Sequence, residues 1–118
     1  MKLTEIAGTL GLCSLTPELA VAADTAEVQG GYVSDLLSDV LAHAPQGGVL
    51  VTIQVHMNVI AVCVHAGLVA VIFASGREPD EMVRKKATEE GIALYVSSQT
   101  AFDIAGQLYA LGLRGERP

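Results

Sequence analysis

The sequence predicts one α/β domain built on a small, mostly parallel sheet with helices on both faces, and three observations lead to this fold class. No formally charged residue occurs between Val40 and Ser75. Strand-like runs occupy residues 49–55, 68–74 and 92–96, and helix-like segments follow each of them. The resulting β-α-β-α-β-α order after residue 49 favours parallel strands joined by right-handed crossovers.

The stretch TIQVHMNVIAVCVHAG, residues 52–67, fits a membrane span, one long strand, or a strand followed by a helix. A span needs about 20 mostly apolar residues. Residues 55–74 have that length, but two histidines and an asparagine interrupt them, and no aromatic belt marks their ends. One strand over 49–66 would be about three times the usual length. We therefore predict that the strand gives way to a short helix, buried all round, with Asn58 as N-cap and Gly67 just beyond its end.

The first third of the chain gives weaker signals. Helical spacing over residues 3–10 predicts a packing helix that ends at Gly11. The same residues resemble the first helix of a helix-turn-helix, but no basic recognition helix follows them. Residues 19–23 fit a short strand. At Gly30 and Gly31 we expect a break where the backbone takes positive φ.

Three further helices are marked by the residues at their starts. Ser34 is a predicted N-cap, with Asp35 in the first turn of its helix. The segment 79–90 opens with proline, which is favoured at the first helical position. The last helix is expected to begin after Ser98 or Thr100.

Composition makes self-association the expected state. The chain is 51% hydrophobic and 17% charged, below the ~25% charged that is usual for globular domains. We expect residues 1–118 to form one domain, with a core over about 3–112 and a frayed tail at 113–118. So little polar surface around such a core predicts an exposed apolar patch and a homodimer. A well-packed monomer is the alternative.

The net charge indicates which partners the chain can bind, and its cysteines indicate the cellular compartment. The net charge of −6, with seven Lys and Arg in total, disfavours nucleic-acid binding. Cys13 and Cys63 lack CxxC spacing and are expected to be free, buried thiols in a reducing cytosol. Glu5 interrupts the apolar N-terminal stretch, so we predict no signal peptide, no membrane association and a cytoplasmic protein.

Polar residues follow each predicted parallel strand, and we expect them to form a ligand-binding edge. In open parallel sheets, ligands bind beyond the carboxyl ends of the strands, where helix N-termini favour anions. The candidate ligand-binding residues are Gly30, Gly31, Asp35, Thr52, Gln54, His56, Asn58, Ser75, Gly76, Ser97 and Ser98. The alternative is that these side chains only cap helices.

Catalytic chemistry is not predicted. His56 would need an orienting carboxylate to act as a base or phospho-acceptor, and only Asp35 and Glu78 lie near it in this interpretation. A neutral His56 that donates to a ligand or to a backbone carbonyl is the simpler hypothesis. His56, Cys63 and His65 lack metal-ligand spacing. There is no GxxxxGK[ST], GxGxxG or nucleophile-elbow motif, so we predict no enzyme, no cofactor and no metal.

A resemblance to stand-alone DRTGG domains covers about residues 3–112. It runs through three segments: EVQGGYVSDLLSDVLAHAP, VTIQVHMNVIAVC and GREPDEMVRKKATEEGIALYVSSQTAFDIAG. Its most specific parts are GGYVSDLLS and TIQVHMN. Where the family tends to have Asp-Arg before the glycine pair, this chain has Ala-Glu-Val-Gln at residues 26–29.

The resemblance implies the fold of the N-terminal domain of HPr kinase/phosphorylase without its catalytic P-loop domain. Similar domains lie between CBS domains in regulated pyrophosphatases and in front of phosphotransacetylases, where they are regulatory or dimerising modules. Stand-alone versions are often encoded near redox and hydrogenase genes. The resemblance therefore implies a redox or metabolic enzyme as a partner.

Two functional hypotheses follow. The first is a non-catalytic, homodimeric regulatory module that senses an anionic metabolite, such as an adenine nucleotide, at the carboxyl ends of the strands. It predicts that substitution of His56 and Asn58 abolishes binding without unfolding the protein. The second is a pure interaction or dimerisation module for a redox or metabolic enzyme, with no small-molecule ligand. It predicts a tight oligomer and no stabilisation by ligands.

Overall fold

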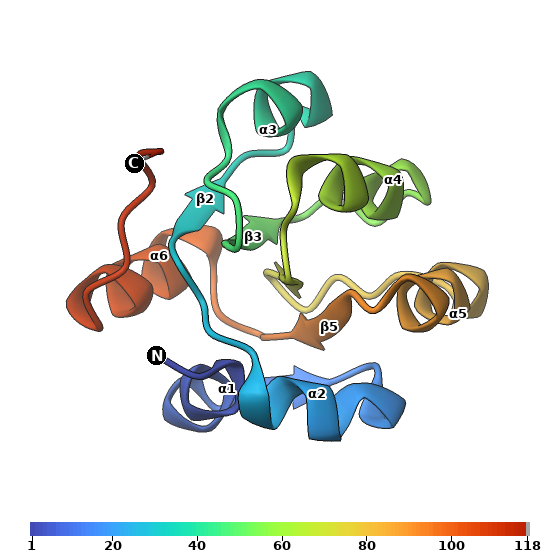
Figure 1. The fold of residues 1–118 in the computed structure, drawn as a ribbon, viewed down its shortest axis with the longest axis horizontal. Coiled ribbons are helices and arrows are strands. Elements are labelled where there is room, and N and C mark those ends of the chain that lie inside the picture. The colour runs from blue at the N-terminus through green and yellow to red at the C-terminus, as the bar shows by residue number, and fades with distance from the viewer. Residues whose placement is uncertain (118) are drawn as a thin grey trace.

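The polypeptide folds around one five-stranded sheet, as described over residues 1–117 by a computed structural model (Figure 1). The strands are β1 (Cys13–Ser14), β2 (Gly31–Val33), β3 (Val49–Thr52), β4 (Ala70–Phe73) and β5 (Ala93–Val96). Their order across the sheet is β1-β5-β4-β3-β2. β2 to β5 are parallel, and β1 is antiparallel to β5. The predicted mostly parallel α/β fold is confirmed, and β1 and β2 extend the sheet at its two edges.

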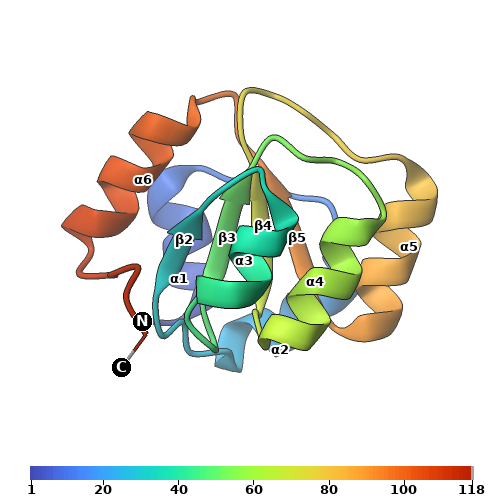
Figure 2. The same ribbon diagram turned by 90° about the horizontal axis from the view of Figure 1, so that it is seen from above.

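Helices cover both faces of the sheet. They are α1 (Leu3–Leu10), a 3-10 turn η1 (Pro17–Leu19), α2 (Ala20–Thr25), α3 (Leu37–His43), α4 (Asn58–Ala66), α5 (Glu81–Glu90) and α6 (Ala101–Ala110). Each strand from β2 to β5 lies beside the strand that precedes it in the chain. Right-handed crossovers therefore put α3, α4 and α5 on the same face. α1, α2 and α6 cover the other face (Figures 1 and 2).

The core divides at the sheet because successive strand residues point to opposite faces. Val49, Val51 and Ile72 pack with the helices α1 and α6. Leu50 and Phe73, from the same strands, pack with α3, α4 and α5. All residues of β3 and β4 are buried, as expected for central strands of a sheet covered on both faces.

The structure confirms that residues 52–67 contain a strand end followed by a helix. β3 ends at Thr52, and α4 begins after Met57, which takes the N-cap position predicted for Asn58. Gly67 follows the helix with φ 72°, as predicted. The expectation that α4 is buried all round is wrong, since the side containing Val64 is exposed. Among residues 1–117, no helix has the length and apolarity needed to cross a membrane.

Two expectations for the N-terminal segment are wrong. Residues 19–23, predicted as a strand, belong to η1 and α2. Pro17 suits the first position of a helical turn and the alanines that follow it favour a helix, which outweighs the single valine. Cys13, predicted to be buried, is exposed on the edge strand β1. Cys63 is buried, and burial raises the pKa of its thiol to about 12.

The starts of the later helices differ in detail from the sequence expectations. α3 begins at Leu37, three residues after Ser34, so Ser34 is not its N-cap. Asp80 rather than Pro79 stands directly before α5, and its carboxylate accepts a hydrogen bond from the Val83 N–H at 3.1 Å. Of the two residues predicted to cap α6, Thr100 is the N-cap.

Candidate functional site

The four parallel strands end at one edge of the sheet, and most of the predicted site residues lie there. β2 is followed by Ser34 and Asp35, and β3 ends at Thr52 and is followed by Gln54. β4 and β5 are followed by three serines and a glycine among the remaining candidates: Ser75, Gly76, Ser97 and Ser98. We call this side of the sheet the carboxyl edge. The prediction that these side chains share one edge therefore agrees with the strand directions.

Asp35 and Thr52 are brought together, but they bind each other. Asp35 lies in the loop before α3 rather than in its first turn. Its carboxylate accepts hydrogen bonds from the Thr52 hydroxyl at 2.8 Å and from the Ile53 N–H at 2.9 Å. The Thr52 oxygen also accepts from the Gln54 N–H at 3.0 Å. Thr52 is fully buried. This network holds the ends of β2 and β3 together, and it leaves Thr52 no access to a ligand.

The loops after β4 and β5 also satisfy one another. The Ser75 N–H donates to the carbonyl of Gln99 at 2.7 Å, and the Gly76 N–H donates to the carbonyl of Ser97 at 2.8 Å. The Ser97 hydroxyl accepts from the Gln99 N–H at 3.1 Å. Both Ser75 and Gly76 have positive φ, 57° and 68°. The Ser75, Gly76 and Gln99 N–H groups of these two loops are therefore already used within the protein.

The loop between β3 and α4 is different, because several of its polar groups are free. The Nδ1 atom of His56 accepts a hydrogen bond from the Asn58 N–H at 3.1 Å. That bond requires an unprotonated Nδ1, so a neutral His56 carries its proton on Nε2 and can donate it outward. Within the described residues, the side chains of Gln54 and Asn58 make no hydrogen bond. His56 and Asn58 are exposed and Gln54 is partly exposed.

A hollow of about 500 Å³ lies between this loop and the start of α5. We call it the β3–α4 hollow. It is lined by Gln54, Val55, His56, Met57, Asp80, Met82 and Val83. Valine and methionine side chains supply its apolar walls, and an amide, an imidazole and a carboxylate supply its polar groups. Sequence reasoning identified Gln54 and His56 as site residues but did not identify Asp80.

A larger open groove of about 860 Å³ runs along the outer side of α5. It contains none of the residues predicted from the sequence. Its charged lining combines Glu18, Asp80, Glu81 and Glu89 with Arg84 and Lys85. This acidic surplus does not suit the anionic ligand that the sequence predicted.

Gly30 and Gly31 lie at the amino ends of the parallel strands, opposite the carboxyl edge that holds the other candidates. Gly31 begins β2 and pairs with Val49, the first residue of β3. Neither glycine has positive φ, so the expected left-handed break is wrong. Instead, a Cβ on Gly30 would lie 2.7 Å from the carbonyl oxygen of Arg114, which accepts a hydrogen bond from the Gly31 N–H at 3.1 Å. Gly30 is therefore needed where the C-terminal segment crosses the edge of β2.

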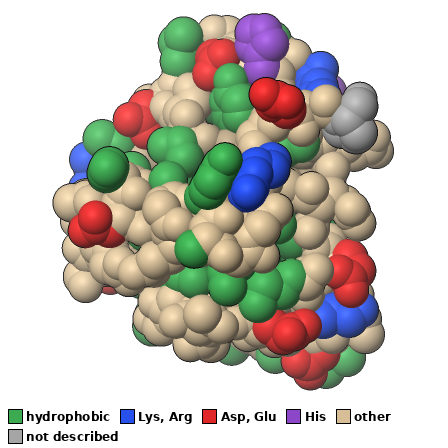
Figure 3. Space-filling model, turned by 90° about the vertical axis from the view of Figure 1, so that its left-hand side faces the viewer, with side chains coloured by type: hydrophobic (Ala, Val, Ile, Leu, Met, Phe, Trp, Pro, Cys, Tyr) green, Lys and Arg blue, Asp and Glu red, His purple; other side chains and the backbone are tan. Residues whose placement is uncertain are grey.

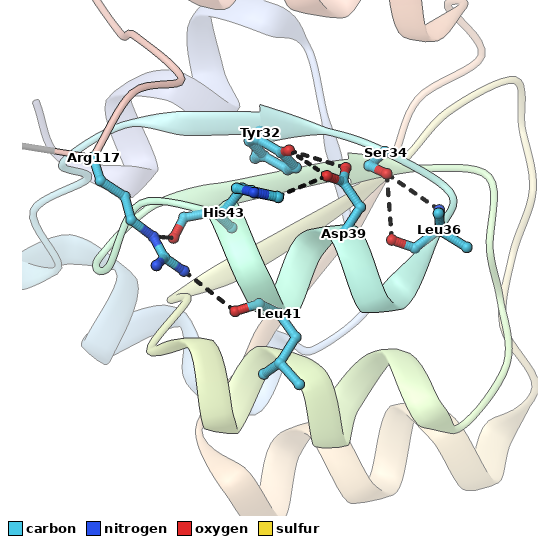
Figure 4. Close-up of polar contacts among 8 residues, drawn as sticks. Tyr32, Ser34, Leu36, Asp39, Leu41, His43 and Arg117 are labelled. Atoms are coloured by element: carbon cyan, nitrogen blue, oxygen red, sulfur yellow. Dashed lines mark hydrogen bonds and ion pairs between the residues drawn. The ribbon is translucent and has the colours of Figure 1, made fainter.

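The tail predicted to fray over residues 113–118 makes specific contacts beside β2 and α3 within its described part, 113–117, while residue 118 lies outside the described residues (Figure 4). The Arg117 guanidinium donates to the carbonyl of Ala44 at 3.0 Å and to that of Leu41 at 3.2 Å. These carbonyls lie at the end of α3, where a cation also interacts favourably with the helix dipole. Leu113 packs against the core beneath α6.

A polar cluster that the sequence analysis missed joins β2 to α3 (Figure 4). The Tyr32 hydroxyl lies 2.9 Å from both carboxylate oxygens of Asp39, and His43 Nδ1 lies 3.0 Å from one of them. Hydrogen bonding by Ser34, then by Tyr32 and His43, lowers the pKa of Asp39. Partial burial and the Asp39 carboxylate raise the pKa of Tyr32. The i, i+4 spacing of Asp39 and His43 was the available sequence signal. The cluster fixes α3 on the edge strand.

No group of three or more His, Cys, Asp or Glu residues within 1–117 is arranged to hold a metal ion. His56 and His65 lie at opposite ends of α4, and Cys63 points into the core. His65 Nδ1 lies 2.9 Å from the carbonyl of Ala61, so this histidine is bound to its own helix.

Comparisons with known proteins support the fold. No protein-family model matches the chain, and no curated protein matches it. A solved structure of the CBS and DRTGG domains of the regulatory region of Clostridium perfringens pyrophosphatase, complexed with the activator diadenosine tetraphosphate, is similar with a TM-score of 0.67 and 11% identity. The similarity covers 91% of this chain and 45% of that one, so this chain spans less than half of the neighbour's length. At this identity the likeness shows a related α/β fold and nothing further.

Proposed function

We propose that this chain is a non-catalytic regulatory module of the DRTGG type that senses an anionic metabolite, with an adenine nucleotide as the favoured class. The observation that carries the proposal is the set of free polar groups around the β3–α4 hollow. Gln54 and His56 line the hollow with unused hydrogen-bonding groups, and the side chain of Asn58 is free at the start of α4. The loops after β4 and β5 instead bond to each other through the Ser75 and Gly76 N–H groups. The solved neighbour is a regulatory region that contains a nucleotide activator, which is compatible with this class of ligand.

The chemistry of the β3–α4 hollow fits a nucleotide better than a simple anion. The N–H groups of Asn58, Val59 and Ile60 are bonded within the first turn of α4, so what this helix end offers an anion is its dipole. His56 Nε2 can donate a hydrogen bond to a phosphate oxygen. Asp80 would repel a bare anion, but its carboxylate suits an amino group such as that of a purine. Met57 and Met82 offer polarizable apolar walls for a flat ring. A volume of about 500 Å³ falls within the usual range for small-molecule sites.

A thermal-shift screen of the purified chain against nucleotides, dinucleotides, phosphate and anionic metabolites tests the proposal. A ligand at ~100 times its dissociation constant adds about 2.7 kcal/mol to the free energy of unfolding. That corresponds to a shift of several degrees in a domain of this size. We expect the shift to disappear in His56→Ala and Asn58→Ala and to persist in His65→Ala, which removes an exposed histidine from the other end of α4. An unchanged ligand affinity in His56→Ala and Asn58→Ala would refute the site.

The second candidate is a pure interaction module for a redox or metabolic enzyme. The observation that favours it is the number of large apolar side chains on the surface, among them Val21, Leu36, Met82 and Phe102. This function predicts a tight oligomer and no stabilisation by any compound in the screen. In either case we propose a homodimer, as the low charged content predicts, and a reducing cytoplasmic setting, in which free Cys13 and Cys63 persist.

A further inference from the structure

The outward side of α6 carries an apolar stripe next to β2. Phe102 is 76% exposed and Tyr109 is 61% exposed, and Ala105 lies between them on the same side of the helix. Val33, on the edge strand, is 48% exposed beside them. A small, mostly apolar hollow of about 190 Å³ separates β2 from α6 and the C-terminal segment. Figure 3 shows hydrophobic side chains spread over this side of the molecule.

The stripe is nearly symmetric about its own centre. Phe102 and Tyr109 are equally distant in sequence from the Ala105-Gly106 step. If a second α6 lies across the first in the antiparallel direction, each phenylalanine meets the tyrosine of the partner. The smallest residues then lie at the crossing, where helices approach most closely. This self-complementarity is what a two-fold, isologous interface requires.

Gly106 has no structural role within the chain. It lies in the interior of α6, it is exposed, and no other atom lies within 4 Å of the place a Cβ would take. After proline, glycine is the least favourable residue in a helix interior. Gly8 in α1 has equally open surroundings, so openness alone does not identify a contact. What distinguishes Gly106 is its position midway between two exposed aromatic residues.

Charge at the two ends of the stripe is also complementary. The Arg114 guanidinium lies over the ring of Tyr109, 3.6 Å from its centroid, so the tyrosine end of the stripe is positive. Asp103 follows Phe102 in the first turn of α6, so the phenylalanine end is negative. An antiparallel pair places the positive end of each copy at the negative end of the other. The two helix dipoles are then antiparallel, which is the favourable arrangement for dipoles that lie side by side.

The C-terminal segment limits the contact to helices. The outward-facing Gly31 N–H of β2 is already bonded to the Arg114 carbonyl at 3.1 Å. A strand of another molecule therefore cannot pair along the whole edge of β2. The exposed apolar surface beside this edge is the stripe on α6 together with Val33.

We propose that this surface binds a second copy of the chain, with α6 antiparallel to α6 of the partner and crossing it at Ala105 and Gly106. Phe102 then packs against Tyr109 of the partner subunit, in the offset or edge-to-face geometry that aromatic pairs prefer. The inference deepens the proposed homodimer by assigning its surface, and it does not depend on the ligand.

Sedimentation equilibrium of the full chain with Gly106→Lys tests the surface. Lysine is a better helix former than glycine and reduces the net negative charge, so the monomer should stay folded and repel itself less. At the centre of the interface, however, its bulk and charge should weaken dimerisation about 30-fold or more, as for a hot-spot residue. Gly8→Lys makes the same change at the other open helical glycine and should leave the dimer intact.

Oxidative cross-linking gives an independent readout. In a Cys13→Ser background, Gly106→Cys places a thiol next to the two-fold axis, within reach of its copy. We expect a covalent dimer, and Gly8→Cys should give none. A wild-type monomer at micromolar concentration would overturn both the homodimer and this surface, while leaving the ligand screen to decide the sensing function. A dimer that survives Gly106→Lys would overturn the surface alone.

Discussion

Two kinds of loop at the carboxyl edge begin from the same sequence signal and end in opposite states. The loops after β4 and β5 bond to each other through Ser75, Gly76 and Ser97, so the Ser75 and Gly76 N–H groups are used within the protein. The loop after β3 uses His56 only to bond the first turn of α4 and leaves the side chains of Gln54 and Asn58 free. Polar residues after a strand thus indicate a loop at this edge. The neighbouring loops determine which of them remain available to a ligand.

The difference lies in the path that each loop takes after its strand. β4 and β5 are neighbours, and the loops that follow them meet, because each has a carbonyl or an N–H facing the other. The loop after β3 is anchored at its base by Thr52 and Asp35 and then extends away over the start of α5. Substitutions at Thr52, Gly76, His56 and Asp39 test this contrast, and their expected effects on stability decrease in that order.

Thr52→Val should have the largest effect, because it removes the anchor of the loop after β3. The change conserves shape but removes the buried Thr52 hydroxyl, and with it the bonds to the Asp35 carboxylate and the Gln54 N–H. We expect a loss of about 2 kcal/mol in the free energy of unfolding, measured by urea denaturation. Ser98→Ala, an exposed change at the same edge, should stay within ~0.5 kcal/mol. Equal losses in both variants would mean that Thr52 is no anchor.

The loops after β4 and β5 bond to each other, and we call them the closed loops. Gly76→Ala tests them through a change in the backbone alone. Gly76 has φ 68°, and no atom lies within 4 Å of the place a Cβ would take. The cost is therefore that of holding alanine in the left-handed region, about 1 kcal/mol in the free energy of unfolding. Gly8→Ala, at an open glycine inside a helix, should instead stabilise by ~0.5–1 kcal/mol. If Gly76→Ala is neutral, the closed loops tolerate rearrangement and their contrast with the loop after β3 weakens.

His56→Ala should change stability by less than ~0.5 kcal/mol, since it removes one exposed bond at the start of α4. Ser97→Ala removes a buried acceptor from the Gln99 N–H and should cost about 1 kcal/mol. Ligand stabilisation in thermal-shift assays should show the reverse order, with loss in His56→Ala and retention in Ser97→Ala. If both variants bind equally well, the two kinds of loop do not differ in function.

Asp39 lies in α3, outside the loops compared above, and its variant serves as a reference for their stability effects. Its pKa is lowered in the folded protein, chiefly by hydrogen bonds from Ser34 and Tyr32. A lowered folded-state pKa means that its stabilisation is present above the unfolded value of ~4 and is lost as pH falls through the lower folded value. Asp39→Asn should therefore reduce the loss of stability between pH 5 and pH 3 in urea titrations. The effect should be the smallest of the four, because the group is solvent-screened. An unchanged pH profile would contradict the assignment.

Much of the sheet could be predicted because its signals are local. Buried runs of β-branched residues identify β3 and β4, and Gly67 marks the end of α4 whatever surrounds it. β1, β2 and α2 were not predicted, because an edge strand of two or three residues acquires its identity only from its partner, which is β5 for β1 and β3 for β2. Helix propensity in the alanine-rich segment after Pro17 is also a weak local signal.

The candidate site was only partly predictable for the same physical reason. The directions of parallel strands placed Gln54, His56 and Asn58 at the correct edge. Gly30 was predicted to contact a ligand, but its close neighbour is the carbonyl of Arg114. A sequence does not distinguish a glycine that leaves room for a phosphate from one that leaves room for a carbonyl. Asp35 can bond to Thr52 only because β2 lies beside β3, and no local sequence pattern predicts that pairing.

The strand order also implies an order of assembly. From β2 to β5 each strand pairs with the next one in the chain, so each step closes only a short loop and costs little chain entropy. The pairing of β1 with β5 and the contact of Arg114 with Gly31 instead join distant segments across the two edges. We therefore expect the amides of β3 and β4 to exchange hydrogen slowest and those of β1 and the C-terminal segment to exchange fastest. Both edges of the sheet would then open while its centre stays folded.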